Sequence, residues 1–242
     1  MIKFFRKIRQ RLLAEGNLKR YLLYAIGEIL LVVIGILIAL QINSWNEWKK
    51  DRVKEKIVLN DLAKNIEINI QTFRNDINLL EEWGRSSEIV ILALENKTVY
   101  SDTLRNHFHL ARITKQKLFV SNIGFQAYKD FGLDLITNKN LSEEIIKLYE
   151  FTIPSILSPN DLVNELDAEW VNHIVQNFDF VEGVGLTPND YESLFADHYY
   201  VSWVKAYSQG RIFLINTDQK LIKECENVLQ LILNELEKSN PQ

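Results

Sequence analysis

The sequence predicts an all-α protein in which a single N-terminal transmembrane helix continues into an antiparallel helical bundle. Glycine and proline are scarce, with nine and four among 242 residues, whereas a β-sandwich or barrel needs a turn every ~8–12 residues. Long stretches in which apolar residues recur at helical spacing occupy most of the chain. The expected parts are a basic leader (1–20), a transmembrane helix (21–45) and one extramembrane helical domain (46–242).

The segment from Tyr21 to Ile42 is long and apolar enough to cross a membrane. It has 22 residues and one charged residue, Glu28. As a helix rising about 1.5 Å per residue it reaches about 33 Å, against about 30 Å for a hydrocarbon core. A cleaved signal peptide has a shorter apolar core and a small-residue cleavage site, so an uncleaved signal anchor is the better interpretation. The aromatic residues expected at the two membrane interfaces are Tyr21, Tyr24, Trp45 and Trp48.

The leader alternates basic with apolar residues, a pattern typical of a helix that lies in the headgroup region and contacts membrane lipid. Its basic residues are Lys3, Arg6, Lys7, Arg9, Arg11, Lys19 and Arg20. The alternative is that these charges only set orientation. They outnumber the basic residues that follow the span, so the positive-inside rule predicts a cytoplasmic N-terminus. In a bacterial inner membrane, the C-terminal domain would then be periplasmic.

One face of the expected span combines small residues with the glutamate. Spacings of three and four place on this face Ala25, Glu28, Val32, Gly35, Ala39 and Ile42. Gly35 and Ala39 form a pair that allows two helix backbones to approach closely. An acid at the centre of a span costs roughly 2.5–3.5 kcal/mol, so we expect Glu28 to be protonated or hydrogen-bonded in a helix–helix contact. The alternative is a glutamate that reaches the interface beside incidental small residues.

Residues 19–52, KRYLLYAIGEILLVVIGILIALQINSWNEWKKDR, closely resemble the N-terminal signature of a family of uncharacterised single-pass membrane proteins of Bacteroidota. Residues 119–150, FVSNIGFQAYKDFGLDLITNKNLSEEIIKLYE, resemble that family's mid-chain pattern of an aromatic helix, a glycine turn and another helix. The resemblance implies a basic leader, one span and a helical body in a bacterial host. It implies no activity, because the family is a domain of unknown function, and it transfers no functional residue.

The residues from Trp48 to about Leu94 are expected to form one long helix, or two helices joined at Gly84. An apolar stripe at helical spacing consists of Leu59, Leu62, Ile66, Ile70, Phe73, Ile77 and Leu80. Asn69 and Asp76 interrupt strict heptads, which favours packing within a bundle over a long coiled coil.

Further helices are expected over 101–113, 123–131 and 142–153. Ser158 and Thr187 each precede Pro-Asn-Asp, which places a hydroxyl at a helix cap and proline in the first turn. They predict helices over 158–178 and 187–200, with a loop or short extended piece between them. The last helix is expected to begin at Asn216 or Thr217. Its buried face should consist of Leu221, Cys225, Val228, Ile232 and Leu236.

The sequence contains no recognisable catalytic, zinc-binding or phosphate-binding motif. His107 and His109 diverge on a helix, whereas Glu169 and His173 share a helix face and are expected to form a surface ion pair rather than a metal site. Cys225, the only cysteine, is expected to be a buried structural thiol. We therefore expect no cofactor, no metal and no enzymatic activity.

A triad of Asp197 and His198 with Ser193 or Ser202 finds no support, because closeness in sequence is not catalytic geometry. The net charge of −4 combines a basic leader with an acidic body, and an acidic body disfavours nucleic-acid binding. Many aromatic residues crowd the C-terminal third and are expected mostly in the core.

The predicted function is that of a membrane-anchored helical envelope protein. It would act as an interaction, scaffold or accessory module, through self-association as a homo-oligomer or through a membrane-protein partner. The alternative is a sensor-like domain that binds a small ligand between its helices. An aromatic-lined pocket with convergent polar groups would favour this alternative.

Overall fold

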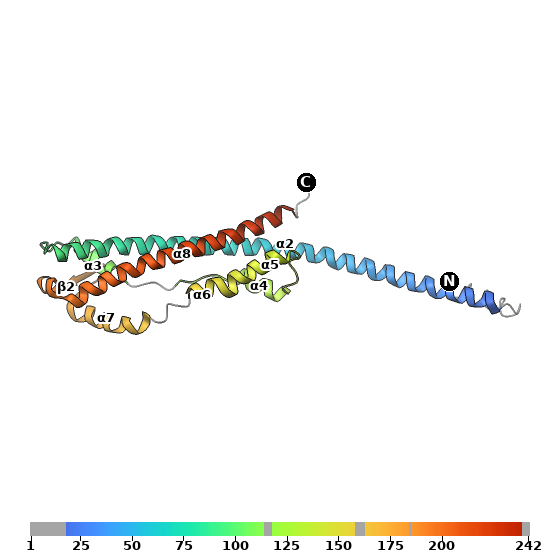
Figure 1. Cartoon of the computed structure of the whole chain (residues 1–242), viewed down its shortest axis with the longest axis horizontal. Helices are drawn as coiled ribbons and strands as arrows, with labels where there is room; N and C mark the ends of the chain where they lie inside the picture. Colours follow the sequence, from blue (N-terminus) through green and yellow to red (C-terminus); the bar gives the residue numbers. More distant parts are fainter. Residues whose placement is uncertain (1–17, 114–117, 158–162, 184, 239–242) are drawn as a thin grey trace. The chain divides into compact units, whose positions relative to one another are not determined.

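The computed structural model describes residues 18–113, 118–157, 163–183 and 185–238 (Figure 1). The chain divides into two compact units, Met1–Lys54 (unit 1) and Glu55–Gln242 (unit 2). The long helix α2 (Leu18–Glu95) supplies all the described residues of unit 1 and the first helix of unit 2. The described residues are otherwise mostly helical, so the predicted all-α class is confirmed.

As far as its residues are described, unit 2 is a helical bundle with a small β-hairpin. Its elements after α2 are α3 (Leu104–Ala111), α4 (Ile123–Phe131), α5 (Lys139–Lys147), the π-helix η1 (Leu148–Thr152), α6 (Ile153–Leu157), α7 (Val163–Asn177), β1 (Phe178–Val181), β2 (Gly185–Pro188), the 3₁₀ helix η3 (Glu192–Ala196) and α8 (His198–Lys238). In Figure 1, α8 runs beside the unit 2 part of α2. The two helices are antiparallel, since Glu95 bonds Lys205 at 2.6 Å and Arg74 bonds Glu226 at 2.8 Å.

The apolar stripe predicted on α2 forms its buried face. Of its seven members, Leu59, Leu62, Ile66, Ile70, Phe73 and Leu80 are buried and Ile77 is partly buried. Gly84 does not divide the helix, which continues to Glu95. An isolated glycine costs a helix only ~1 kcal/mol, so the packed stripe is enough to keep the helix continuous.

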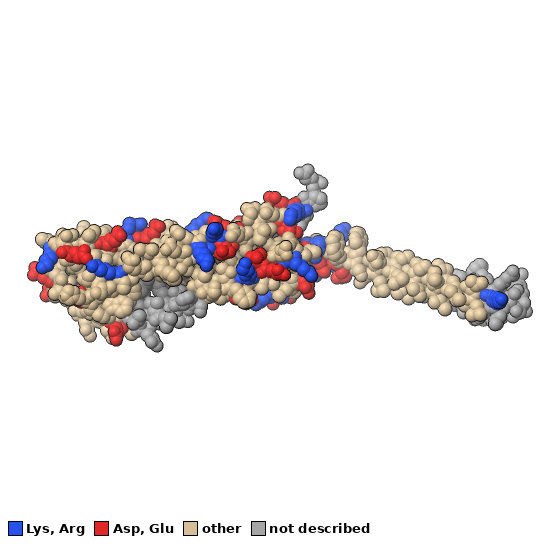
Figure 2. Space-filling view, in the orientation of Figure 1, with Lys and Arg blue, Asp and Glu red and all other residues tan. Residues whose placement is uncertain are grey.

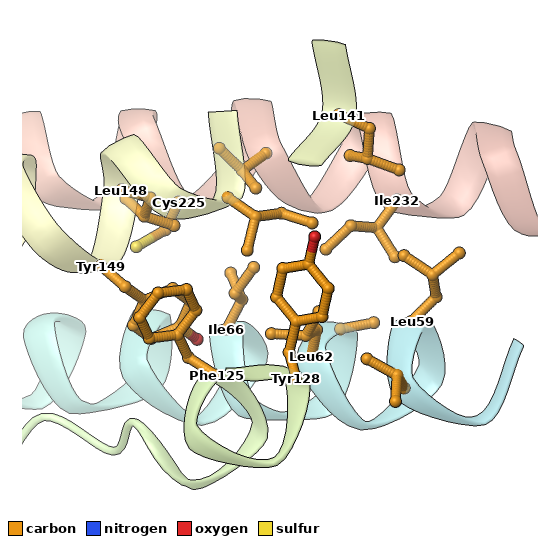
Figure 3. Close-up of a cluster of buried hydrophobic side chains, with 14 of the residues drawn as sticks. Leu59, Leu62, Ile66, Phe125, Tyr128, Leu141, Leu148, Tyr149, Cys225 and Ile232 are labelled. Atoms are coloured by element: carbon orange, nitrogen blue, oxygen red, sulfur yellow. The ribbon is translucent and has the colours of Figure 1, made fainter. Parts of the chain in front are cut away.

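The described residues of unit 2 form two hydrophobic cores. The first core is largely aliphatic and joins α2 to α4, α5, η1, α6 and α8 (Figure 3); its centre includes Leu59, Leu62, Ile66, Phe125, Tyr128, Leu148, Tyr149, Cys225 and Ile232. The second core is rich in aromatic rings and joins the end of α2 to α3, α7, the hairpin and the start of α8. Its centre includes Val90, Leu94, Phe108, Trp170, Phe178, Leu186, Tyr200 and Val204.

Buried polar residues on α2 attach the segment before α4. The Asn69 amide donates to Ser121 O and accepts from Ser121 N, both at 2.8 Å. The Asn65 amide donates to Ser121 Oγ at 2.9 Å. These bonds satisfy backbone groups that would otherwise be buried without partners. The interruption of the heptads therefore reflects packing within a bundle, as predicted.

The helix predicted from Thr187 is absent, because Thr187 and Pro188 lie in strand β2. That strand pairs antiparallel with β1, and Phe178 lies opposite Pro188. The turn between the strands uses the positive φ values of Gly183 (71°) and Gly185 (118°), which glycine adopts without steric cost. Pro188, which the sequence suggested as part of the first turn of a helix, is instead the last residue of strand β2.

The prediction for the last helix was wrong at its start. Helix α8 begins at His198 and has 41 residues, and the Asp197 side chain accepts from Tyr200 N at 2.9 Å at its N-terminus. Thr217 does not cap a helix; its hydroxyl donates to Phe213 O at 2.9 Å inside α8. The buried face predicted from Leu221 to Leu236 is confirmed.

The start of α5 also differs from the prediction. The helix begins at Lys139, and the Asn138 side chain accepts from Leu141 N at 3.3 Å. Ser142, the expected first residue, is instead buried and shares a 2.7 Å hydrogen bond with the Tyr128 hydroxyl. Residues 158–162 at the expected Ser158 start lie outside the described residues, and the described helix α7 ends at Asn177.

Candidate membrane-spanning helix

Residues 22–42 of α2, within unit 1, expose apolar side chains on all sides of the helix. Among the described residues, α2 is the helix that is long and apolar enough to cross a membrane, with a mean hydropathy of 2.6 in its most apolar window and none of that window buried. Every Leu, Ile and Val from residue 22 to residue 42 is between 42% and 72% exposed. Figure 2 shows this stretch almost free of charged residues, whereas the visible face of unit 2 carries both signs. A helix that is apolar all round requires an apolar environment.

The predicted contact face lies on one uninterrupted stretch of helix. The helical spacing therefore places the members of the predicted contact face on one side of the helix. They are Ala25, Glu28, Val32, Gly35 and Ala39. A Cβ atom built on Gly35 meets nothing within 4 Å. This leaves a shallow position in the helix surface that a second helix can approach, and the contact itself stays a prediction.

Most of the predicted membrane-surface cations lie outside the described residues, namely Lys3, Arg6, Lys7, Arg9 and Arg11. Lys19 and Arg20 lie in the first turn of α2, and Lys19 is exposed. The role of these residues at a lipid surface stays a prediction.

Two exposed tryptophans follow the apolar stretch. Trp45 and Trp48 are 60% and 56% exposed. The Lys49 ammonium lies 5.2 Å from the Trp45 ring centroid, and the Arg52 guanidinium carbon lies 5.9 Å from that of Trp48. Aromatic rings next to cations are typical of the boundary between hydrocarbon and headgroups.

The histidines of unit 2 have separate surroundings. His107 Nδ1 lies 3.2 Å from Ser86 Oγ on α2, whereas His109 lines a surface hollow of about 480 Å³ between α3 and the hairpin. Burial, assisted by the Arg112 charge, lowers the pKa of His109. The other residues lining the hollow are Asn106, Phe180, Val181, Glu182, Gly183 and Gly185.

The contact expected between Glu169 and His173 is not formed, and His173 contacts Asp197 instead. His173 Nε2 lies 2.7 Å from Asp197 Oδ2, and the other Asp197 oxygen caps α8. Glu169 is exposed. Asp197 therefore joins α7 to the start of α8. His173 contacts a residue 24 positions away in the sequence, whereas the helical spacing suggested a residue four positions away. No group of three metal-ligating side chains occurs among the residues that the structure describes.

Arg211 is a buried cation that the sequence reasoning missed. It donates to Ser87 Oγ on α2 at 2.6 Å and to two carbonyl oxygens at the end of α3, Ala111 O at 2.8 Å and Ile113 O at 2.7 Å. Burial lowers its pKa to about 10. Arg211 continues the helical spacing of Tyr200, Val204 and Tyr207. A basic residue at a position of this apolar series is the sequence signal that could have identified it.

Asp76 on α2 and Asp218 on α8 form a second buried polar contact. They are 5% and 3% exposed. Burial, a hydrogen bond with Asp76 and the charge of Asp76 raise the pKa of Asp218 to about 8. A hydrogen bond between two carboxyl groups requires that they share a proton. The sequence reasoning noted Asp76 only as a break in a heptad pattern.

Cys225 lies in the first core and is completely buried. Burial, assisted by the charges of Glu224 and Glu226, raises the pKa of the thiol to about 12. A thiol in this state is not nucleophilic at neutral pH, so the prediction of a structural cysteine is confirmed.

One protein-family model matches residues 28–92 of the chain; it describes a family of unknown function (DUF6090). The matched residues comprise most of the candidate span and nearly all of the unit 2 part of α2. No curated protein and no solved structure matches the chain.

Proposed function

We propose that this protein is a membrane-anchored interaction module without enzymatic activity. The unit 1 part of α2 crosses a bacterial inner membrane once, and unit 2 is the folded domain that the membrane helix carries. The contact face of the span binds a second membrane helix, either from another copy or from a membrane-protein partner.

A single observation carries this proposal. The apolar stretch of α2 leaves all its Leu, Ile and Val side chains exposed, and transfer of such a surface out of water is worth roughly 25 cal/mol per Å². The family match includes residues 28–42 of this stretch, so most of the stretch lies within the matched region.

The orientation follows the positive-inside rule: the N-terminus is cytoplasmic and unit 2 is periplasmic. A reporter that is active only after export, fused after Lys238, tests this topology in bacterial cells. We expect an active reporter in a membrane fraction that resists alkaline extraction. An inactive reporter on a membrane-embedded protein would reverse the orientation, and release by alkali would contradict the anchor.

Helix association is tested by enlarging the contact face. Gly35→Leu combined with Ala39→Leu should reduce cross-linking between copies, or to a partner, in native membranes, because the two backbones can no longer approach. Gly27→Leu is the matched control. Added atoms at Gly27 also meet nothing within 4 Å, but Gly27 lies about 100° around the helix from Glu28. Equal cross-linking by all three proteins would contradict a contact at this face.

The hollow between α3 and the hairpin supports the second candidate function, the binding of a small ligand. It combines the Phe180 ring with the polar side chains of Asn106 and His109. Native mass spectrometry of the full-length protein from its own membranes distinguishes the two functions. A complex with a second chain supports the interaction module, and a monomer that retains a small molecule supports the ligand-binding domain.

A further inference from the structure

We propose that the turn formed by Phe131, Gly132 and Leu133 of unit 2 (the 131–133 turn) inserts its two apolar side chains into the headgroup boundary of the membrane that α2 crosses. This inference rests on the proposed membrane anchor and adds a second contact with lipid. Its partner is the lipid surface, whether the headgroups are neutral or anionic.

The 131–133 turn presents two large apolar side chains to solvent. Phe131 is 57% exposed and Leu133 is 44% exposed. Gly132, with a φ of 101°, donates from its N–H to Lys129 O at 3.1 Å and reverses the chain. The hydroxyl of buried Tyr128 donates to Leu133 O at 2.7 Å. The turn is thus attached to the first core, and insertion into lipid requires little further ordering.

The turn lies at the end of unit 2 where the unit begins. Leu135 N donates to Gly132 O at 3.0 Å, and the following Thr137 donates from its N–H to the Glu55 carboxylate at 2.6 Å. Glu55 is the first residue of unit 2. The Asn138 amide also bonds Glu235, near the end of α8, at 2.8 Å.

The chain itself limits how far this end of unit 2 can lie from the membrane. Trp48 marks the expected interface, and Glu55 follows it seven residues later within α2. Seven helical residues span about 10 Å. This limit holds for any orientation of unit 2. Elements that lie in the membrane interface bury their apolar side about 5–10 Å into the headgroup region, so the Glu55 end of unit 2 lies close to the region into which the turn is proposed to insert.

The charges at the turn favour apolar insertion over electrostatic attraction. Asp130 and Asp134 flank the turn, and Lys129 is paired with Glu150 at 2.9 Å. The two acidic side chains remain among the headgroups, so that only the side chains of Phe131 and Leu133 insert below them. We therefore expect insertion into vesicles of neutral phosphatidylcholine, with little dependence on anionic lipid or salt.

The test places an environment-sensitive fluorophore on the turn of the full-length protein in phosphatidylcholine vesicles. The labelled variant is Phe131→Cys, and the wild type controls for reaction of the buried Cys225. Phe180→Cys is a matched control, because Phe180 is 55% exposed and lies on β1 beside the second core. We expect the label at position 131 to emit at shorter wavelength and to be quenched by lipids brominated near the headgroup, while the label at 180 keeps the emission and quenching of an aqueous site.

Three other outcomes overturn the proposal and are distinguishable. Protein that floats with the vesicles but shows no bromolipid quenching at position 131 retains its anchor and lacks the second contact. A short-wavelength emission that depends on the protein-to-lipid ratio and resists bromolipid assigns the turn to a second copy. Protein that fails to float overturns the proposed anchor itself. Leu133→Cys repeats the measurement on the other side of Gly132.

Discussion

The unit 1 and unit 2 stretches of helix α2 differ in where their polar and apolar side chains lie. In unit 1, the helix exposes apolar side chains on every side from residue 22 to residue 42. In unit 2, one stripe is buried, the exposed face is mostly polar, and the buried stripe includes Asn65, Asn69 and Asp76. One continuous helix therefore follows two different patterns.

The difference fits the proposed lipid surroundings of the unit 1 stretch and the packed surroundings of the unit 2 stretch. A helix in lipid satisfies its backbone internally and needs no polar stripe. In the bundle, neighbouring segments lie against α2 with backbone groups of their own, and Asn69 bonds both backbone groups of Ser121. The polar residues in the buried stripe therefore specify which segment packs where. The three changes below test this contrast, from the largest expected effect to the smallest.

Phe73→Ala should destabilise unit 2 by about 3–5 kcal/mol, because a fully buried ring leaves a cavity. Phe73 has no exposed surface in the first core. The measurement is urea unfolding of the full-length protein in mild detergent, followed by tryptophan fluorescence. Ile34→Ala, on the apolar stretch of unit 1, should leave the unfolding midpoint of unit 2 unchanged. Equal losses for both variants would abolish the distinction between the two stretches.

The buried pair of Asp76 and Asp218 should make unit 2 less stable as the pH rises. An aspartate in an unfolded chain has a pKa of about 3.9, and that of Asp218 in the folded protein is about 8. Between these values the folded state holds a proton that the unfolded state has lost, so the free energy of unfolding falls with pH across this window. Below the window, the pair causes no such loss.

Asp218→Asn removes this titration while keeping a hydrogen-bond donor for Asp76. The variant should unfold at a higher temperature than the wild type near pH 8, and the difference should shrink towards pH 4. Thermal unfolding at a series of pH values measures both effects. Asp130→Asn, at an exposed position, controls for the loss of one negative charge. If the unfolding temperature of Asp218→Asn fell with rising pH as steeply as that of the wild type, the pH dependence would belong to other groups.

Arg74→Ala should have the smallest effect. Its ion pair with Glu226 joins α2 to α8 at the surface, where the two side chains are 54% and 49% exposed. Exposed pairs contribute about 0–1 kcal/mol, and salt screens them. We expect a change within this range that disappears in high salt. A loss as large as that of Phe73→Ala would mean that the surface, rather than the apolar stripe, holds α2 against α8.

Glycine shows where local reasoning about the chain succeeds and where it stops. Gly84 lies inside a periodic stretch, and the helix continues through it. Gly183 and Gly185 instead belong to a hairpin, at a place where the sequence suggested a loop or short extended piece and then a proline-started helix. Leu186 of the hairpin is fully buried in the second core, which also contains residues of α2, α3 and α8. Contacts at such separations leave no local pattern.

The sequence by itself determined the helical class, the apolar stretch of α2 and the buried stripe that follows it, because periodicity and composition are properties of neighbouring residues. The tertiary structure alone decided where α8 begins, because Asp197 caps it while also bonding His173 of α7. It also decided the partners of Arg211 and Asp218, which lie on other helices far away in sequence. A buried charged side chain must find its hydrogen-bond partners inside the protein. Which partners are available depends on which segments pack together.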